Sequence, residues 1–151
     1  MRTPESVEQK LKELGVELPA PPEPFGIYAE AVQTGNLLFL TGMLPTEGRS
    51  AKFVGRLGAE LNLEEARDAA RLAAINALAV ARQHLGSLDK VTRIVRLGVS
   101  VATSGDVRDQ PKVADGASER SSMWKPGARR RTSRRSTCSR SPRSIWDRWT
   151  K

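Results

Sequence analysis

The spacing of apolar residues near the N-terminus predicts a short amphipathic helix followed by an extended connector. Three apolar residues recur at helical spacing: Val7, Leu11 and Leu14. Thr3 suits the N-cap before them, Pro4 suits the first helical position, and Gly15 ends the pattern. The stretch LPAPPEPFG, residues 18–26, cannot be helical, because each proline removes a backbone donor and biases the preceding residue toward extended geometry.

Two apolar runs, Ile27–Val32 and Asn36–Thr41, are separated by a turn around the sequence QTGN. Gly35 suits a tight reversal, so these runs predict a β-hairpin. Glycine and proline punctuate the next segment, in which AKFVG, residues 51–55, is a candidate third short strand.

The strongest periodic signal predicts a helix from about Leu63 to Leu85. Asn62 and Glu65 match a capping box, and Gly86 suits the C′ position. Small or apolar residues gather toward one side of this helix: Ala66, Ala69, Ala73, Ala77 and Val80. Because small side chains let a helix axis approach its neighbour closely, this stripe predicts packing against a sheet.

Downstream of this helix, the segment DKVTRIVRLGVSVATSGD has the two-residue period of a half-covered strand. Valine and leucine alternate with polar residues and glycine, which predicts one long strand. The next segment, DVRDQPKVADGAS, can begin a second helix, with Asp109 as its cap and Pro111 near its start. From Glu119 onward neither a helical nor a strand period appears.

Composition divides the chain in two. A length of 151 residues allows one domain. The excess positive charge lies entirely after Ser118, and residues 119–151 also contain every tryptophan and the only cysteine. We therefore expect one domain over residues 1–118 and a basic, arginine- and serine-rich tail over residues 119–151 that lacks ordered structure.

Several classes of protein are disfavoured by the same composition. The lone Cys138 cannot form an internal disulfide, and the N-terminus lacks the features of a signal peptide. No apolar stretch approaches the ~20 residues that a membrane span requires. We expect a cytoplasmic protein with no membrane partner, no cofactor and no metal ion.

Three long stretches match motifs of one family in the same order. They are LGVELPAPPEPFGIYAEAVQTGNLLFLTGMLP, GRLGAELNLEEARDAARLAAINALAVARQHLGSLDKVTRIVRLGVSV and DQPKVADGAS. Together, from about Leu14 to Ser118, they resemble the RidA/YjgF family, in its endoribonuclease L-PSP branch. The resemblance implies an α+β, chorismate mutase-like fold, with helices packed on one face of a mixed sheet, that assembles as a homotrimer with clefts between subunits.

The resemblance also implies an activity. Characterised relatives hydrolyse reactive enamines and imines of the 2-aminoacrylate class to keto acids and ammonia, whereas others have been assigned ribonuclease activity or none. Such hydrolysis needs a cation that holds the substrate carboxylate and a positioned water. The family motifs carry substrate-binding roles onto Tyr28 of the Y-x-x-A-V segment and onto Thr41 and Gly42, and Asp115 lies near an asparagine of the relatives. Each of these residues also has a purely structural interpretation, Tyr28 as a half-buried strand aromatic.

One family motif is missing from this chain. In relatives, the carboxylate-binding arginine belongs to R-S-x-V-x-V-x-x-L-P, which precedes a last strand of the type V-E-V-E-A-I. Neither stretch occurs here, since the chain continues from DGAS into arginine-rich sequence. We therefore expect the C-terminal part of the fold to be missing and catalysis to be impaired, and no catalytic residue is assigned.

The arginine-rich tail has two interpretations. Its clustered arginines can neutralise RNA phosphates while tryptophans stack on bases. The candidate nucleic-acid residues are Arg129, Arg130, Arg131, Arg134 and Arg135. The abrupt onset and the mixed Arg, Ser, Thr, Pro, Trp and Cys content are also typical of a GC-rich gene translated in the wrong frame, which favours a frameshift near Ser118. The alternatives to a deaminase are thus an RNA-binding protein or endoribonuclease, and a non-catalytic trimeric binder of small ligands.

Overall fold

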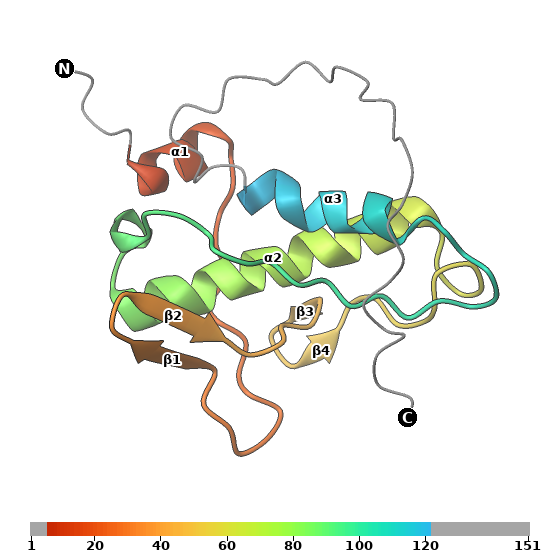
Figure 1. Ribbon diagram of the computed structural model, residues 1–151, viewed down its shortest axis with the longest axis horizontal. Coiled ribbons are helices and arrows are strands. Elements are labelled where there is room, and N and C mark those ends of the chain that lie inside the picture. The colour runs from red at the N-terminus through yellow and green to blue at the C-terminus, as the bar shows by residue number, and fades with distance from the viewer. Residues whose placement is uncertain (1–5, 122–151) are drawn as a thin grey trace, which may run out of the picture.

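A computed structural model describes residues 6–121 as an α+β arrangement built around one long helix (Figure 1). The elements are α1 (Val7–Glu13), β1 (Ala31–Thr34), β2 (Leu37–Leu40), β3 (Thr46–Glu47), β4 (Ser50–Ala51), α2 (Leu63–Leu85), the 3-10 turn η1 (Leu88–Lys90) and α3 (Gln110–Ser121). In the view of Figure 1, α1 and α3 lie on one side of α2 and the two hairpins lie on the other. The α+β class predicted from the sequence is confirmed.

The first helix begins later than the sequence motif predicted. Thr3 and Pro4 lie outside the described residues, and Ser6 is the N-cap, with its hydroxyl accepting a hydrogen bond from the Gln9 amide at 3.3 Å. Asp89, the middle residue of η1, binds the same helix end, because its carboxylate accepts hydrogen bonds from the Ser6 hydroxyl at 2.9 Å and from the Val7 amide at 2.7 Å. The hydrogen bond from Ser6 is the largest cause that holds the pKa of Asp89 below its ordinary value of 3.8.

The Asp89 contact predicts a response to acid. Because the pKa of Asp89 is lower in the folded chain than in the unfolded chain, its contribution to stability is present above the unfolded value of about 3.9 and is lost as the pH falls through the folded value. We expect the stability difference between the parent and Asp89→Asn to be constant above about pH 5 and to shrink below it. Urea unfolding at a series of pH values measures this difference, with Asp106→Asn as the exposed control. A difference that does not change with pH would contradict the prediction.

Both ends of α2 agree with the sequence. The Asn62 side chain accepts from the Glu65 amide and the Glu65 carboxylate accepts from the Asn62 amide, each at 2.9 Å, which completes the predicted capping box. At the other end, Gly86 adopts a left-handed conformation with φ of 82° and donates its amide to the Arg82 carbonyl. Local sequence therefore sets the length of the central helix.

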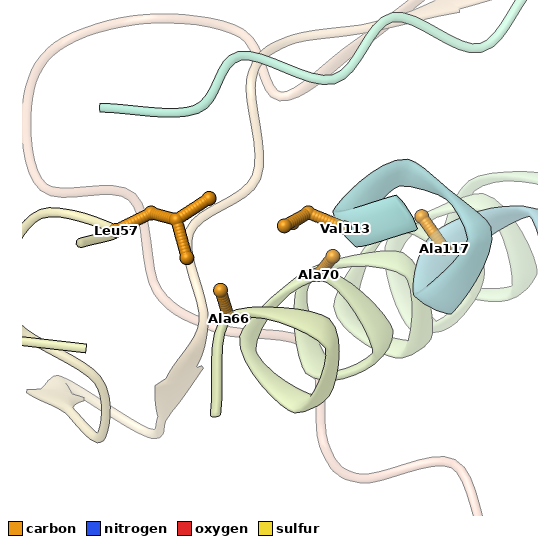
Figure 2. Close-up of a cluster of buried hydrophobic side chains, with 5 residues drawn as sticks. All are labelled: Leu57, Ala66, Ala70, Val113 and Ala117. Atoms are coloured by element: carbon orange, nitrogen blue, oxygen red, sulfur yellow. The ribbon is translucent and has the colours of Figure 1, made fainter. Parts of the chain in front are cut away.

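Two groups of buried residues lie along α2. The group near its C-terminal half consists of Leu11, Leu78, Ala81 and Leu88, and half-buried Leu38 and Leu40 of β2 pack against it. The group near its N-terminal half consists of Leu57, Ala66, Ala70, Val113 and Ala117. Figure 2 shows the side chains of the second group converging between α2, α3 and the loop that carries Leu57.

The helix α2 packs against two different partners. Ala66 of the predicted stripe, with the neighbouring Ala70, packs against α3. The C-terminal half of α2 contacts the first hairpin, as the predicted packing against a sheet requires, because Leu38 and Leu40 of β2 pack against Leu78 and Ala81. A Cβ atom added at Gly116 of α3 would lie 2.3 Å from the carbonyl oxygen of Arg67, so the two helix backbones are in direct contact there. The sequence correctly indicated a close approach, and the closest approach of backbones is to α3, which continues through Ser121.

The predicted hairpin and its turn are confirmed, but its first strand begins at Ala31 and not at Ile27. β1 and β2 are antiparallel, with Val32 opposite Phe39, and Gly35 in the turn has φ of 53°. A second small hairpin joins β3 to β4. The predicted strand over residues 51–55 is correct only at Ala51, the last residue of β4.

The predicted long strand after α2 is wrong. Residues 91–101 belong to no strand, and within residues 6–121 they have no partner strand; only isolated bridges follow, such as Leu57 with Thr103. The described sheets are therefore two separate antiparallel pairs, not one mixed sheet. Alternating sequence gives a segment its preference for extended geometry, but a strand needs backbone partners, and the hairpins pair only with themselves.

None of the helices within residues 6–121 is both long enough and apolar enough to cross a membrane.

Candidate functional site

A pocket lies where the chain enters and leaves the first hairpin. The connector before β1 supplies Glu23 and Tyr28, and the loop after β2 supplies Gly42 and Leu44. Its cavity volume is about 30 Å³, and the space beyond it is open to solvent. Because antiparallel pairing of β1 with β2 brings the two flanking segments together, the hairpin itself forms the pocket.

Tyr28 is held in the pocket wall by a tight local turn. Its amide donates to the Gly26 carbonyl at 3.1 Å, and its phenolic oxygen accepts a hydrogen bond from the Phe25 amide at 3.3 Å. The side chain remains 47% exposed. The phenol O–H is therefore able to donate a hydrogen bond to a ligand while the ring stays in place.

Of the other predicted site residues, one lines the pocket and two do not. Gly42 lines the pocket together with Tyr28. Thr41 is exposed and does not line it; its amide donates to the Glu30 carbonyl at 3.0 Å and extends the hairpin ladder. Asp115 is exposed on α3, which packs on the opposite side of α2 from the hairpins (Figure 1), so the structure does not bring it to this pocket.

The charged residues that line the pocket are both acidic. They are Glu23 and Glu30. Glu23 lies 3.3 Å from Arg49, but both side chains are about 70% exposed, so this ion pair is weak. Among the residues that the structure describes, no arginine or lysine lines the pocket. The negative charge of its two carboxylates therefore disfavours a bound anion.

Asn76 of α2 holds one wall of the pocket in place through hydrogen bonds to its backbone. It is 1% exposed, and its side-chain amide donates to the backbone carbonyls of Leu44 at 3.0 Å and Thr46 at 2.9 Å. Leu44 and Thr46 both line the pocket. Sequence reasoning missed Asn76, although a polar residue on the buried side of an alanine-rich helix is a signal that such a partner exists.

The remaining predictions concern metal binding and nucleic-acid binding. Within residues 6–121, no group of three or more His, Cys, Asp or Glu side chains is arranged to hold a metal ion. The five candidate nucleic-acid arginines, Arg129, Arg130, Arg131, Arg134 and Arg135, lie outside the described residues.

Comparisons with known proteins agree with this fold. The model of the family described as YjgF/chorismate mutase-like, putative endoribonuclease, matches residues 8–137. A curated relative, protein TCP17 of Trypanosoma cruzi, is 37% identical over 113 residues, which are 75% of this chain and 71% of that protein.

Two solved structures are similar in both sequence and fold. The crystal structure of a putative endoribonuclease from Shewanella oneidensis MR-1 has a TM-score of 0.71 at 29% identity and covers 80% of each chain. The crystal structure of protein Atu1372 from Agrobacterium tumefaciens, whose function is unknown, has a TM-score of 0.69 at 33% identity and covers 79% of this chain and 72% of that one. With the sequence motifs, the fold and the family model in agreement, this chain belongs to the YjgF/chorismate mutase-like family.

Proposed function

We propose that the pocket beside Tyr28 binds small enamine or imine metabolites and hydrolyses them slowly. The observation that carries this proposal is that one pocket combines the phenol of Tyr28, the carboxylate of Glu30 and the open backbone of Gly42. In imine hydrolysis, water adds to the carbon of the C=N bond, and the nitrogen takes up protons and leaves as ammonia. The product keeps the oxygen as a keto group.

Tyr28 and Glu30 have complementary roles in this reaction. The Glu30 carboxylate is half-buried and can accept a proton from the attacking water. The Tyr28 hydroxyl accepts one hydrogen bond from the Phe25 amide, which leaves its proton for the substrate nitrogen or carboxylate. Both groups come from the segment that enters β1, where the Glu30 carbonyl accepts the Thr41 amide and the Tyr28 amide donates to the Gly26 carbonyl.

The electrostatics of the pocket support slow turnover of 2-aminoacrylate. This substrate carries a carboxylate, and the two charged lining residues, Glu23 and Glu30, repel it. The family's arginine motif is absent from the sequence, so the bidentate cation that it supplies is missing.

A coupled assay tests this proposal. A pyridoxal phosphate-dependent dehydratase generates 2-aminoacrylate in situ, and release of keto acid and ammonia above the spontaneous rate is measured. We expect activity above background that is lost in Tyr28→Phe, but well below that of a family member with demonstrated deaminase activity assayed in parallel. Turnover equal to an active relative would contradict the impairment, and no activity above background would contradict hydrolysis.

Glu23 offers a way to increase substrate affinity. Glu23→Gln removes one negative charge from the pocket and releases Arg49 from its ion pair. For an exposed pair, we expect KM for the anionic substrate to fall by about two- to fivefold with little change in kcat. Initial-rate kinetics measure this, with Glu17→Gln, an exposed position before the connector, as the matched control. An equal fall in both variants would show a general charge effect and not a pocket effect.

The second candidate function is endoribonuclease activity, which the family description and the name of the Shewanella relative favour. Cleavage of a fluorescent RNA, with binding measured at several salt concentrations, tests it. Steeply salt-dependent binding that disappears when residues 119–151 are deleted would assign RNA binding to the arginine-rich segment. RNA cleavage by the parent protein that persists in this deletion would assign the activity to the described domain.

We also propose that the chain assembles as a homotrimer. The outward face of the first hairpin supports assembly, because Val32 and Phe39 stand opposite each other there and are 54% and 57% exposed. Sedimentation velocity gives the mass, and a monomer at all concentrations would contradict assembly.

A further inference from the structure

The pocket beside Tyr28 has a charge that selects among its ligands. Glu23 and Glu30 line it, and no arginine or lysine of residues 6–121 does. Arg49 pairs with Glu23, but both side chains are about 70% exposed, so the pocket keeps a net negative charge. Glu30 is half-buried, and within the described chain its carboxylate has neither a hydrogen bond nor an ion pair. A ligand that carries a cation would therefore supply a partner that the described protein does not.

Two aromatic side chains favour the same kind of ligand. Phe25 and Tyr28 line the pocket and are 52% and 47% exposed, so part of each ring is open to a ligand. The face of an aromatic ring attracts a cation, and the attraction grows where the cation loses part of its water. Carboxylates and aromatic rings in one pocket together favour an organic cation over an anion.

The size of the pocket limits how a substrate can lie in it. The cavity volume of about 30 Å³ is room for a water molecule but not for a whole organic substrate. The remaining space is open to solvent, and two apolar lining residues, Phe25 and Leu44, are more than half exposed. A substrate with an apolar group can thus lie in the open part while the attacking water occupies the closed part.

We propose that the preferred substrates of this pocket are imines without a carboxylate, bound as iminium cations R–CH=NH₂⁺ in which R is apolar. This inference rests on the proposed function, because it names the substrates of that hydrolysis. A substrate of the 2-aminoacrylate class brings an anion to two glutamates, whereas an iminium brings the cation that Glu30 lacks. Oxidation of a primary amine is the class of reaction that supplies such an imine.

The chemistry of hydrolysis favours the same charge. Water adds more readily to a protonated C=N bond, and a nearby carboxylate stabilises the protonated form. A C–O bond forms as Glu30 takes a proton from the water, and the C–N bond then breaks with its electron pair going to nitrogen. Both protons of the water end on the nitrogen, so R–CH=NH₂⁺ and water give R–CHO and ammonium.

Two imines that differ only by a carboxylate test the inference with the full-length protein. A flavin-dependent amine oxidase forms the imine of phenethylamine, and a flavin-dependent amino acid oxidase forms the imine of phenylalanine; in both cases oxygen is reduced to peroxide, which catalase removes. Ammonia release above the spontaneous rate, at low imine concentration, measures kcat/KM. We expect kcat/KM to be at least about tenfold higher for the imine without a carboxylate.

Glu23→Gln should change the two reactions in opposite directions. Removing one negative charge should lower kcat/KM for the phenethylamine imine by about two- to fivefold and raise it for the phenylalanine imine by a similar factor. A general loss of structure would lower both. Glu17→Gln, which removes the same charge at an exposed position outside the pocket, should change neither.

Tyr28 provides a measurement that needs no turnover. It is the only tyrosine of the chain, so ring-labelled tyrosine gives a single NMR signal, which reports on the pocket. Phenethylammonium, an unreactive cation of similar shape, should shift this signal saturably. Phenylacetate, which has the opposite charge, should shift it much less at the same concentration.

The outcomes separate this inference from the proposed function. Equal acceleration of the two imines, or greater acceleration of the phenylalanine imine, would overturn the inference and leave hydrolysis in place. No acceleration of either imine would refute hydrolysis, and the Tyr28 signal would then decide whether the pocket selects cations. A larger shift with phenethylammonium than with phenylacetate would support that selection, and any other result would exclude it.

Discussion

Replacing Gly116 with alanine should destabilise the protein by about 3 kcal/mol. The added Cβ would lie 2.3 Å from the carbonyl oxygen of Arg67 and 3.1 Å from its Cα, and both are backbone atoms that cannot rotate away. The helices must therefore separate, which loosens the packing of Val113 and Ala117 against the buried alanines of α2 (Figure 2).

The sign of this effect distinguishes packing from helix propensity. In an isolated helix, Gly→Ala stabilises by about 1 kcal/mol, so a helix without a close neighbour would gain stability from the change. Gly98→Ala is the matched control, because a Cβ there meets no atom within 4 Å and its φ is not left-handed. Denaturant unfolding measures both variants, and an unchanged or higher midpoint for Gly116→Ala would contradict the packing of α2 against α3.

The elements that the sequence predicted correctly are those whose signals are local. The capping box at Asn62 and Glu65, the C′ glycine Gly86 and the turn glycine Gly35 each act on residues within a few positions of themselves. The family resemblance, which depends on long stretches of sequence, is likewise confirmed. The boundary after Ser118 and the frameshift near it stay predictions, since residues 122–151 lie outside the described chain.

The elements that were predicted wrongly depend on distant partners. The alternation after α2 describes a preference, and a ladder forms only where a second strand is present. The small-residue stripe of α2 predicted a sheet as neighbour but gave no sign of α3, whose close approach depends on Gly116, about fifty residues away in the sequence. Asn76 is a comparable case, because its partners are Leu44, in the loop after β2, and Thr46 of β3, which lie about thirty residues earlier in the sequence.

In the candidate site, too, contacts within one hairpin could be predicted from the sequence, whereas contacts between distant elements could not. Tyr28 and Gly42 meet because they flank one hairpin whose register the sequence sets. Asp115 was placed by family motif alone, and α3 packs on the other side of α2. The acidic character of the pocket was also not predicted, since Glu23 and Glu30 come together only through the fold of the connector.

Asn76→Asp should reduce stability by about 3 kcal/mol at neutral pH, although the two side chains have nearly the same shape. The asparagine amide donates to the carbonyls of Leu44 and Thr46 in a site that is 1% exposed. An ionised carboxylate cannot donate, so it would be buried against two carbonyl oxygens. The substitution removes two hydrogen bonds and adds repulsion at the same point.

The pH dependence of Asn76→Asp provides the sharper measurement. Burial beside carbonyl oxygens raises the pKa of the introduced carboxyl above its unfolded value, near 3.9. The cost is therefore smallest below that value, where the group is protonated in both states, and grows as the pH rises toward the folded pKa. Asn36→Asp, in the exposed hairpin turn, makes the same change of charge and should show little dependence on pH. A loss of stability that is the same at pH 4 and at pH 7 would show that Asn76 acts through its shape and not through the two hydrogen bonds that hold the pocket wall.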